Sequence, residues 1–167
     1  MLEDGSVYEG TARGDFKETA CEIVFNTSMT GYVEILTDPS YAGQGVVMTY
    51  PMIGNYGISR EDFESERLQP SAFIVHELSS DPSNFRCTDT IENLLKEYNI
   101  PCISGVDTRA VVKKLRESGT MRGVLTSDIG DRERLMDVIK SFRQIDLVGS
   151  VLSLIHISEP TRRTPIS

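Results

Sequence analysis

The chain contains few of the side chains on which enzyme chemistry most often depends, with three cysteines and two histidines in 167 residues. The cysteines, Cys21, Cys87 and Cys102, lie far apart in the sequence, and no C-x-x-C pair occurs. An odd number of widely spaced cysteines gives no support for a zinc site or a disulfide framework. We interpret all three as buried or idle thiols in a reducing compartment, and we predict no metal site in this chain.

An excess of positive charge is also lacking, because 17 lysine and arginine residues stand against 25 aspartate and glutamate residues, for a net charge of −8. Nucleic acids and anionic membranes are bound by basic surfaces, so we expect neither as a partner. Residues 1–10 include acidic residues and have no apolar core, unlike a signal peptide. The apolar run 147–157 is shorter than the roughly 20 residues of a membrane-spanning helix. These absences predict a cytoplasmic globular protein.

Catalytic and phosphate-binding motifs are not evident. No cysteine is flanked by the glycines of a strand-to-helix elbow, where a nucleophilic thiol would be expected. We interpret His76 as a surface or hydrogen-bonded structural residue. The pair Gly43 and Gly45 is the nearest approach to a phosphate-binding loop, but neither G-x-x-x-x-G-K-[ST] nor G-x-G-x-x-G occurs. We therefore predict no catalytic residue in this chain. An independent cysteine hydrolase stays open only if one of the thiols has a base beside it.

Strands are expected mainly in the first half of the chain. Four short runs there are rich in β-branched and aromatic residues and are bounded by turn formers. They cover residues 22–25, 33–36, 46–50 and 72–75, and two further strand candidates follow at 102–104 and 123–126.

Helices are expected in the second half. Asp89, Asp107 and Asp131 each precede apolar residues at helical spacing and can cap a helix. Each of the three helices has a single apolar stripe, so each is expected to lie on a sheet with its other face in water. Strands backed by helices in this way define an α/β domain.

The segment 25–57, FNTSMTGYVEILTDPSYAGQGVVMTYPMIGNYG, is the most distinctive part of the chain. It contains five glycines, two prolines and four tyrosines. This composition indicates backbone that bends sharply and approaches another surface closely. The segment resembles, almost residue for residue, the amino-terminal domain of the carbamoyl-phosphate synthase small chain. Further matches at 83–86, 105–115 and 121–123 extend the resemblance to about Val151.

The resemblance implies a layered β/β/α domain, with mixed, largely antiparallel strands in the first half and helices packed on one side. It also implies a role in a carbon–nitrogen ligase with glutamine amidotransferase activity, which makes carbamoyl phosphate and glutamate from glutamine, bicarbonate and ATP for arginine and pyrimidine biosynthesis. The implied partners are the large chain, which uses ATP and Mg²⁺, the small chain's own glutaminase domain, and glutamine. We expect the glutaminase domain to be absent from this sequence and the chain by itself to be inactive. A stand-alone, non-catalytic interaction domain is the alternative.

Ser40 is the candidate substrate-binding residue. Asp38 and Pro39 set up a turn at Ser40, and in the resembling family the serine of this D-P-S-Y motif helps to bind glutamine. A hydroxyl group suits that task because it both donates and accepts hydrogen bonds. The rest of the motif is interpreted as architectural or as part of an interface. Those residues are Asn26, Thr30, Gly31, Tyr32, Asp38, Pro39, Gly54, Asn55 and Gly57.

The final residues differ from everything before them. The stretch 152–167, LSLIHISEPTRRTPIS, resembles the translation of a sequencing adaptor. We therefore expect residues 1–151 to form the family domain and 152–167 to be a non-native tail, and we assign no function to His156.

Overall fold

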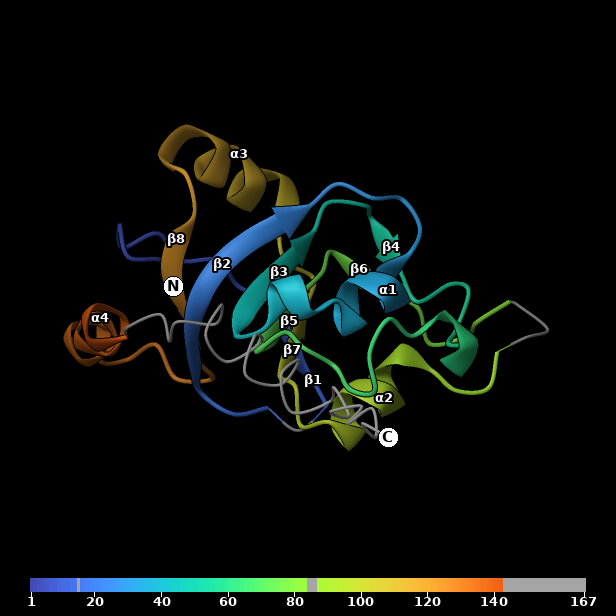
Figure 1. Ribbon diagram of the computed structural model, residues 1–167. Helices are drawn as coiled ribbons and strands as arrows, with labels where there is room; N and C mark the ends of the chain where they lie inside the picture. The colour runs from blue at the N-terminus through green and yellow to red at the C-terminus, as the bar shows by residue number, and fades with distance from the viewer. Residues whose placement is uncertain (15, 84–86, 143–167) are drawn as a thin grey trace, which may run out of the picture.

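The computed structural model describes residues 1–14, 16–83 and 87–142. The tail expected at 152–167 lies outside the described residues. Figure 1 shows the arrangement of the secondary structure. The elements are β1 (Thr11–Arg13), β2 (Thr19–Asn26), α1 (Tyr32–Thr37), the 3₁₀ turn η1 (Pro39–Tyr41), β3 (Gln44–Met48), β4 (Met52–Ile53), the 3₁₀ turn η2 (Arg60–Asp62), β5 (Ala72–Ile74), β6 (Glu77–Leu78), α2 (Ile91–Glu97), β7 (Cys102–Ser104), α3 (Thr108–Ser118), β8 (Met121–Leu125) and α4 (Arg132–Ser141).

Six strands form one sheet in the order β1-β7-β5-β3-β2-β8, and β4 pairs with β6 in a separate two-stranded sheet. The predicted mixed α/β class is confirmed. The expected antiparallel pairing is found at the two outer positions of the large sheet, β1–β7 and β2–β8. The four central strands, β2, β3, β5 and β7, run parallel. Parallel neighbours require crossover connections, and α1 and α2 lie in two of these crossovers.

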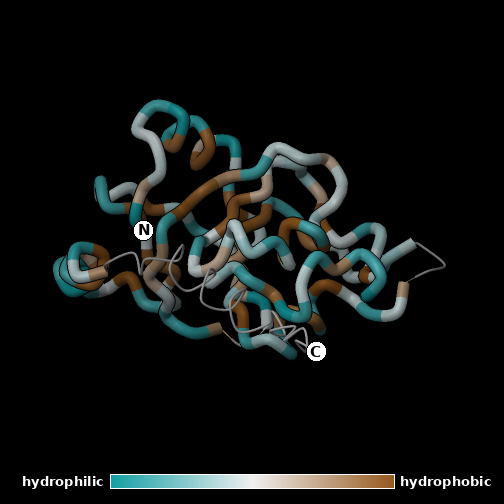
Figure 2. Tube along the Cα trace, viewed as in Figure 1, coloured by the Kyte–Doolittle hydropathy of each residue, from teal (hydrophilic) through white to brown (hydrophobic). Residues whose placement is uncertain are grey.

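The core lies on both faces of the large sheet. Successive residues of a strand point to opposite faces, and the buried residues of β3 follow this rule. Val46 and Met48 pack with α1 and α2 in one cluster, whereas Val47 packs with α3 in another. Hydrophobic residues accordingly concentrate along the central strands (Figure 2).

The helices divide between the two faces. The expectation that the helices of the second half pack on one side holds for α2 and α4, and α1 lies on the same face. Helix α4 packs on Val124 and Ala20. Ala20 precedes Cys21 in β2, and Cys21 points to the opposite face, where it packs with α3. Helix α3 covers the opposite face, where Val111, Val112 and Leu115 are buried. A single apolar stripe identifies a surface helix but does not tell which face of a sheet it covers.

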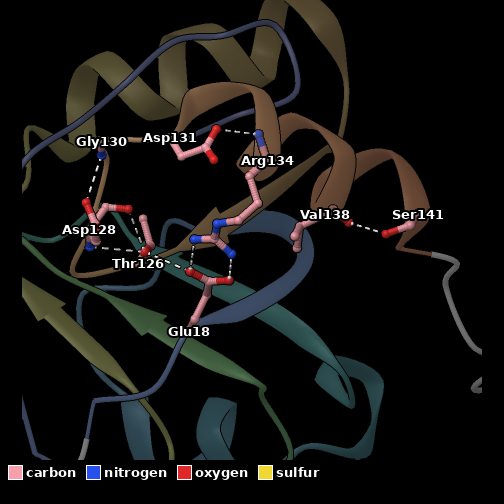
Figure 3. Close-up of polar contacts among 8 residues, drawn as sticks. All are labelled: Glu18, Thr126, Asp128, Gly130, Asp131, Arg134, Val138 and Ser141. Carbon is pink, nitrogen blue, oxygen red and sulfur yellow. Dashed lines mark hydrogen bonds and ion pairs between the residues drawn. The ribbon is translucent and has the colours of Figure 1, made fainter.

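Helix α4 is also fastened to the sheet by polar contacts. The Arg134 guanidinium donates to both carboxylate oxygens of Glu18, at 2.8 and 2.9 Å. Thr126 donates to the same carboxylate at 3.0 Å, so the end of β8 and the start of β2 share this contact with α4 (Figure 3).

Two of the three helix caps are confirmed. The side chain of Asp107 accepts from the backbone N–H of Ala110, and that of Asp131 accepts from Arg134. At α2 the cap is instead Thr90, whose hydroxyl accepts from the N–H of Asn93.

The strand predicted at 33–36 is wrong, because these residues lie in helix α1. Tyr32, Val33, Ile35 and Leu36 are buried against the sheet and provide the apolar face of a short helix. A short apolar run fits either a strand or a helix, and here packing on the parallel strands favours the helix.

Candidate functional site

Ser40 lies in an exposed turn with fixed geometry. Pro39 occupies the first position of η1, where its fixed φ angle suits the turn. The carboxylate of Asp38 accepts a hydrogen bond from the Ser40 N–H at 2.8 Å. Ser40 itself is exposed. The backbone at Ser40 is therefore held in place while its hydroxyl is open to a molecule outside this domain.

A side-chain hydrogen bond ties this turn to the end of β2. The side-chain Nδ2 of Asn26 donates to the Tyr41 hydroxyl at 2.9 Å. The side-chain Oδ1 of Asn26 accepts from the Ser28 N–H at 2.7 Å. Asn26 thus links the residue after Ser40 to the loop that leads into α1. This contact supports the architectural interpretation of Asn26.

Tyr32 joins two parts of the motif across the interior. Its side chain is 3% exposed, and its hydroxyl donates to the Gly57 carbonyl at 2.7 Å and accepts from the Tyr56 N–H at 3.2 Å. Burial raises the pKa of Tyr32 to about 12. The hydroxyl is therefore un-ionised at neutral pH, and it acts as a structural link.

Gly54 and Gly57 close the turn after β4. Both have positive φ angles, 93° and 68°, and the Gly57 N–H donates to the Gly54 carbonyl at 3.1 Å. A Cβ atom on Gly54 would lie 2.8 Å from a methyl of Ile91, and one on Gly57 would overlap the sulfur of Cys87. Only glycine meets both the dihedral and the steric requirement at these positions.

Several of the predicted interface residues meet at one pocket. Thr30, Gly31, Tyr32 and Gly57 line a pocket of about 290 Å³ together with Glu34, Tyr56 and Asp62. Asn55 directly precedes the pocket residue Tyr56 in the sequence, and the backbone carbonyl of Asn55 accepts a hydrogen bond from the Ser83 N–H at 2.9 Å. Ser40, Asp38, Pro39 and Asn26 do not line this pocket. The motif therefore forms two distinct features, the Ser40 turn and the pocket at the start of α1.

Exposed apolar side chains accompany the motif. Met29 is 69% exposed, Tyr56 is 48% exposed and Met52 is 39% exposed. Large exposed apolar side chains that border a defined surface feature are typical of a binding or interaction site. Tyr56 lines the pocket at the start of α1, and Met29 precedes the pocket residue Thr30.

A second feature was not evident from the sequence. Because β2, β3, β5 and β7 are parallel, their carboxyl ends meet at one edge of the sheet, which we call the carboxyl edge. Two pockets of about 510 and 240 Å³ lie there and share Thr49 and Arg109. His76, Asp107 and Thr108 line the smaller pocket. These residues come from three distant parts of the sequence, at Thr49, at His76 and at 107–109, and only strand order brings the three parts together.

The thiols are poor candidates for a nucleophile. Cys21 and Cys102 are fully buried, and burial raises the pKa of each to about 12. Cys87 is partly buried, and its S–H donates to the Asp89 carbonyl at 3.0 Å. His76 is exposed, and its Nδ1 lies 3.1 Å from the Val106 carbonyl. This contact supports the interpretation of His76 as a hydrogen-bonded structural residue.

The part of the chain that the structure describes holds no group of three or more His, Cys, Asp or Glu side chains arranged for a metal ion. Among the same residues, no helix combines the length and apolar content needed to cross a membrane.

Comparison with known proteins identifies the class of protein to which this α/β domain belongs. Residues 1–125 match the family model described as carbamoyl-phosphate synthase small chain, CPSase domain. The chain is 55% identical over 125 residues to the carbamoyl phosphate synthase small chain of Caldanaerobacter subterraneus subsp. tengcongensis, covering 75% of this chain and 35% of the relative. The small chain of Clostridium perfringens is 48% identical over 151 residues, or 90% of this chain and 43% of the relative. That of Archaeoglobus fulgidus is 50% identical over 155 residues, again 90% and 43%.

The chain therefore belongs to the carbamoyl-phosphate synthase small chain family, as the resemblance of segment 25–57 predicted. It spans 35% of the Caldanaerobacter relative and 43% of the Clostridium relative, so it corresponds to part of a small chain.

Proposed function

We propose that this chain is the amino-terminal part of the small subunit of a glutamine-hydrolysing carbamoyl-phosphate synthase. In this proposal it supplies a docking surface for the large chain and for the rest of the small chain, and it completes the glutamine pocket. The complete enzyme converts glutamine, bicarbonate and ATP into carbamoyl phosphate and glutamate. The observation that carries the proposal is the exposed hydroxyl of Ser40 on a rigid turn within the family motif.

The chemistry assigned to Ser40 follows from its setting. The turn holds its backbone through Asp38 and Pro39, so the hydroxyl can be presented to a pocket completed by another part of the polypeptide. A positioned hydroxyl orients the polar end of a substrate without adding charge. Cleavage of the glutamine amide requires a thiolate and a base, and in this proposal both come from the rest of the small chain.

ATP and Mg²⁺ belong to the large chain in this proposal. The described residues offer neither a phosphate-binding glycine loop nor a cluster of acidic ligands. We accordingly assign no step with these groups to this chain. Its own contribution is to position glutamine and to hold the subunits together.

The docking role is supported by the exposed side chains of Met29, Met52 and Tyr56. Aromatic residues and methionine are enriched in protein interfaces. An isolated chain would leave these side chains in water, whereas a partner surface would cover them.

The test is a substitution of Ser40 in a full-length small chain that carries this segment, assayed with its large chain. Ser40→Ala should raise the KM for glutamine about tenfold or more, the loss expected for one or two hydrogen bonds of about 1.5 kcal/mol. Synthesis from ammonia should stay unchanged, because ammonia bypasses the glutamine pocket. The exposed Ser80→Ala variant is a matched control and should leave both reactions unchanged. Equal loss with both nitrogen sources would contradict the role of Ser40.

The isolated chain offers a second readout of the same proposal. Incubated with glutamine, it should release no glutamate above the buffer rate. Glutamate release that scales with the concentration of this chain would show that the catalytic groups lie within it, contrary to the proposal.

A further inference from the structure

The two pockets of the carboxyl edge form a groove with a basic wall. The two pockets are continuous, because both are lined by Thr49 and Arg109. On the side of the sheet, the groove is lined by His76, Thr49 and Thr27. Its other wall is helix α3. We call this feature the α3 groove.

Three cations of α3 line the larger pocket, namely Arg109, Lys113 and Arg116. They are spaced three or four residues apart, so they project from one side of the helix. Glu117 is the acidic residue of that lining, and Asp107 is the acidic residue of the smaller pocket. The α3 groove therefore has a net charge of about +1 at neutral pH, with its cations gathered in the larger pocket. This is a positive surface on a chain whose net charge is −8.

These cations are available to a partner. Among the described residues, the ion pairs use Arg60, Lys96, Lys114, Arg122 and Arg134. Arg109 and Lys113 belong to none of those pairs, and both are exposed. Lys114, on another side of the same helix, is already paired with Asp4 at 2.9 Å.

Arg116 is held in place by an aromatic ring. Its guanidinium lies 5.6 Å from the centroid of Phe25, at the end of β2. A cation over an aromatic face is attracted to the ring, and this contact limits the orientations of the side chain. The Thr27 and Thr49 side chains on the facing wall bring hydroxyl groups, which are able to donate hydrogen bonds to carboxylates of a bound segment.

The spacing of the cations fits an extended acidic segment. Side chains on one face of an extended chain recur every 6.5–7 Å or so. Residues four apart on a helix are separated by about 6 Å along its axis. Carboxylates at alternate positions of an extended segment can therefore face Arg109 and Lys113 in turn.

We propose that the α3 groove binds an acidic segment of the large-chain partner. This inference rests on the proposed function, which makes the large chain a partner of this domain. The rest of the small chain is a poorer occupant, because it is joined covalently and needs no steering. A separate polypeptide must find its place by diffusion, and complementary charge accelerates that step.

The test is the rate at which the large chain associates with a full-length small chain carrying this segment. The double variant R109E and K113E reverses two groove charges. The double variant R132E and K140E makes the same charge change on exposed positions of α4 and is the matched control. Stopped-flow mixing at about 50 mM and about 300 mM salt separates electrostatic steering from other contacts.

At low salt the groove variant should associate at least tenfold more slowly than wild type, and the difference should shrink at high salt. The control variant should stay within about twofold of wild type, and both variants should unfold at the wild-type temperature. Carbodiimide, which joins an amine to a carboxylate at zero length, should cross-link Lys113 to an acidic residue of the large chain, and K113R should abolish that product.

Equal association of the groove and control variants would overturn the groove while leaving large-chain docking intact. Absence of any association with wild-type small chain would overturn the docking function itself. Binding of inorganic pyrophosphate to the wild-type chain is a further measurement. If pyrophosphate binds the wild-type chain through Arg109 and Lys113 while the groove variant associates normally, the groove is a site for a small anion and the proposal is wrong.

Discussion

Tyr32 and Gly57 are joined by a buried hydrogen bond of 2.7 Å between the tyrosine hydroxyl and the glycine carbonyl. The two residues are 25 positions apart within the family motif, and Gly57 is its last residue. The same hydroxyl accepts from the Tyr56 N–H, so one oxygen holds both the start of α1 and the turn after β4. The pocket at the start of α1 exists because these two segments are fixed against each other.

Removing this hydroxyl should destabilise the domain. Tyr32→Phe keeps the ring but leaves the buried Gly57 carbonyl and the Tyr56 N–H without their partner, at a cost of about 1–3 kcal/mol. Urea unfolding followed by circular dichroism measures the loss. Tyr98→Phe is the control, because the Tyr98 hydroxyl bonds to the Glu66 carbonyl at an exposed site, 3.2 Å away. It should change stability by no more than about 0.5 kcal/mol. A Tyr32→Phe effect equal to that of the control would show that the link is not structural.

The contact between Glu18 and Arg134 should give the domain an acid-sensitive component of stability. The hydrogen bond from Arg134, assisted by Thr126, lowers the pKa of Glu18 from 4.5 to about 2. Because the unfolded chain binds the proton more readily, this contribution is fully present above about pH 4.5 and is lost as the pH falls toward 2. The pair is partly exposed, so we expect its value to be below about 1 kcal/mol.

Denaturant unfolding between pH 7 and pH 3 tests this assignment. The stability difference between wild type and Glu18→Gln should be largest at neutral pH and should shrink on acidification. High salt should reduce it further. A Glu18→Gln difference that stays constant with pH would mean that Glu18 acts only through packing or polarity.

The three thiols should differ in reactivity. Burial raises the pKa of Cys21 and of Cys102 to about 12, so neither forms the reactive thiolate at pH 8. Cys87 is partly exposed and should react first. With a chromogenic disulfide reagent, the folded chain should release roughly one thiol equivalent quickly and the remaining two only after unfolding. Cys87→Ser should remove the fast phase. Rapid modification of Cys21 or Cys102 in the folded chain would contradict the burial and would reopen the case for a reactive cysteine.

Local sequence patterns predicted most of the secondary structure, and the reasons are local. The strands at 22–25, 46–50 and 72–75 were predicted because β-branched residues alternate or cluster there, and β2, β3 and β5 occupy these positions. Asp107 and Asp131 were predicted as caps because a carboxylate satisfies the free N–H groups of the first helical turn wherever the chain goes next. The run 33–36 was misassigned because so short an apolar segment has no distinctive period.

The candidate sites divide in the same way. The turn at Ser40 was evident from the sequence, since Asp38 and Pro39 fix a turn by their own geometry. The substrate-binding role of Ser40 was implied only by the resemblance of the motif to the family. The α3 groove was not evident, because Thr27, Thr49 and Arg109 come from three distant segments. Strand order alone places them at one edge.

Composition, spacing and capping residues thus determined the class of domain and the rigid turn at Ser40, because each depends on interactions between near neighbours in the chain. The family was indicated by the resemblance of segment 25–57. Tertiary structure decided which face each helix covers, that the central strands run parallel, and which charges of α3 stay unpaired. Those outcomes depend on how distant segments bury their apolar faces together, and no local pattern specifies that arrangement.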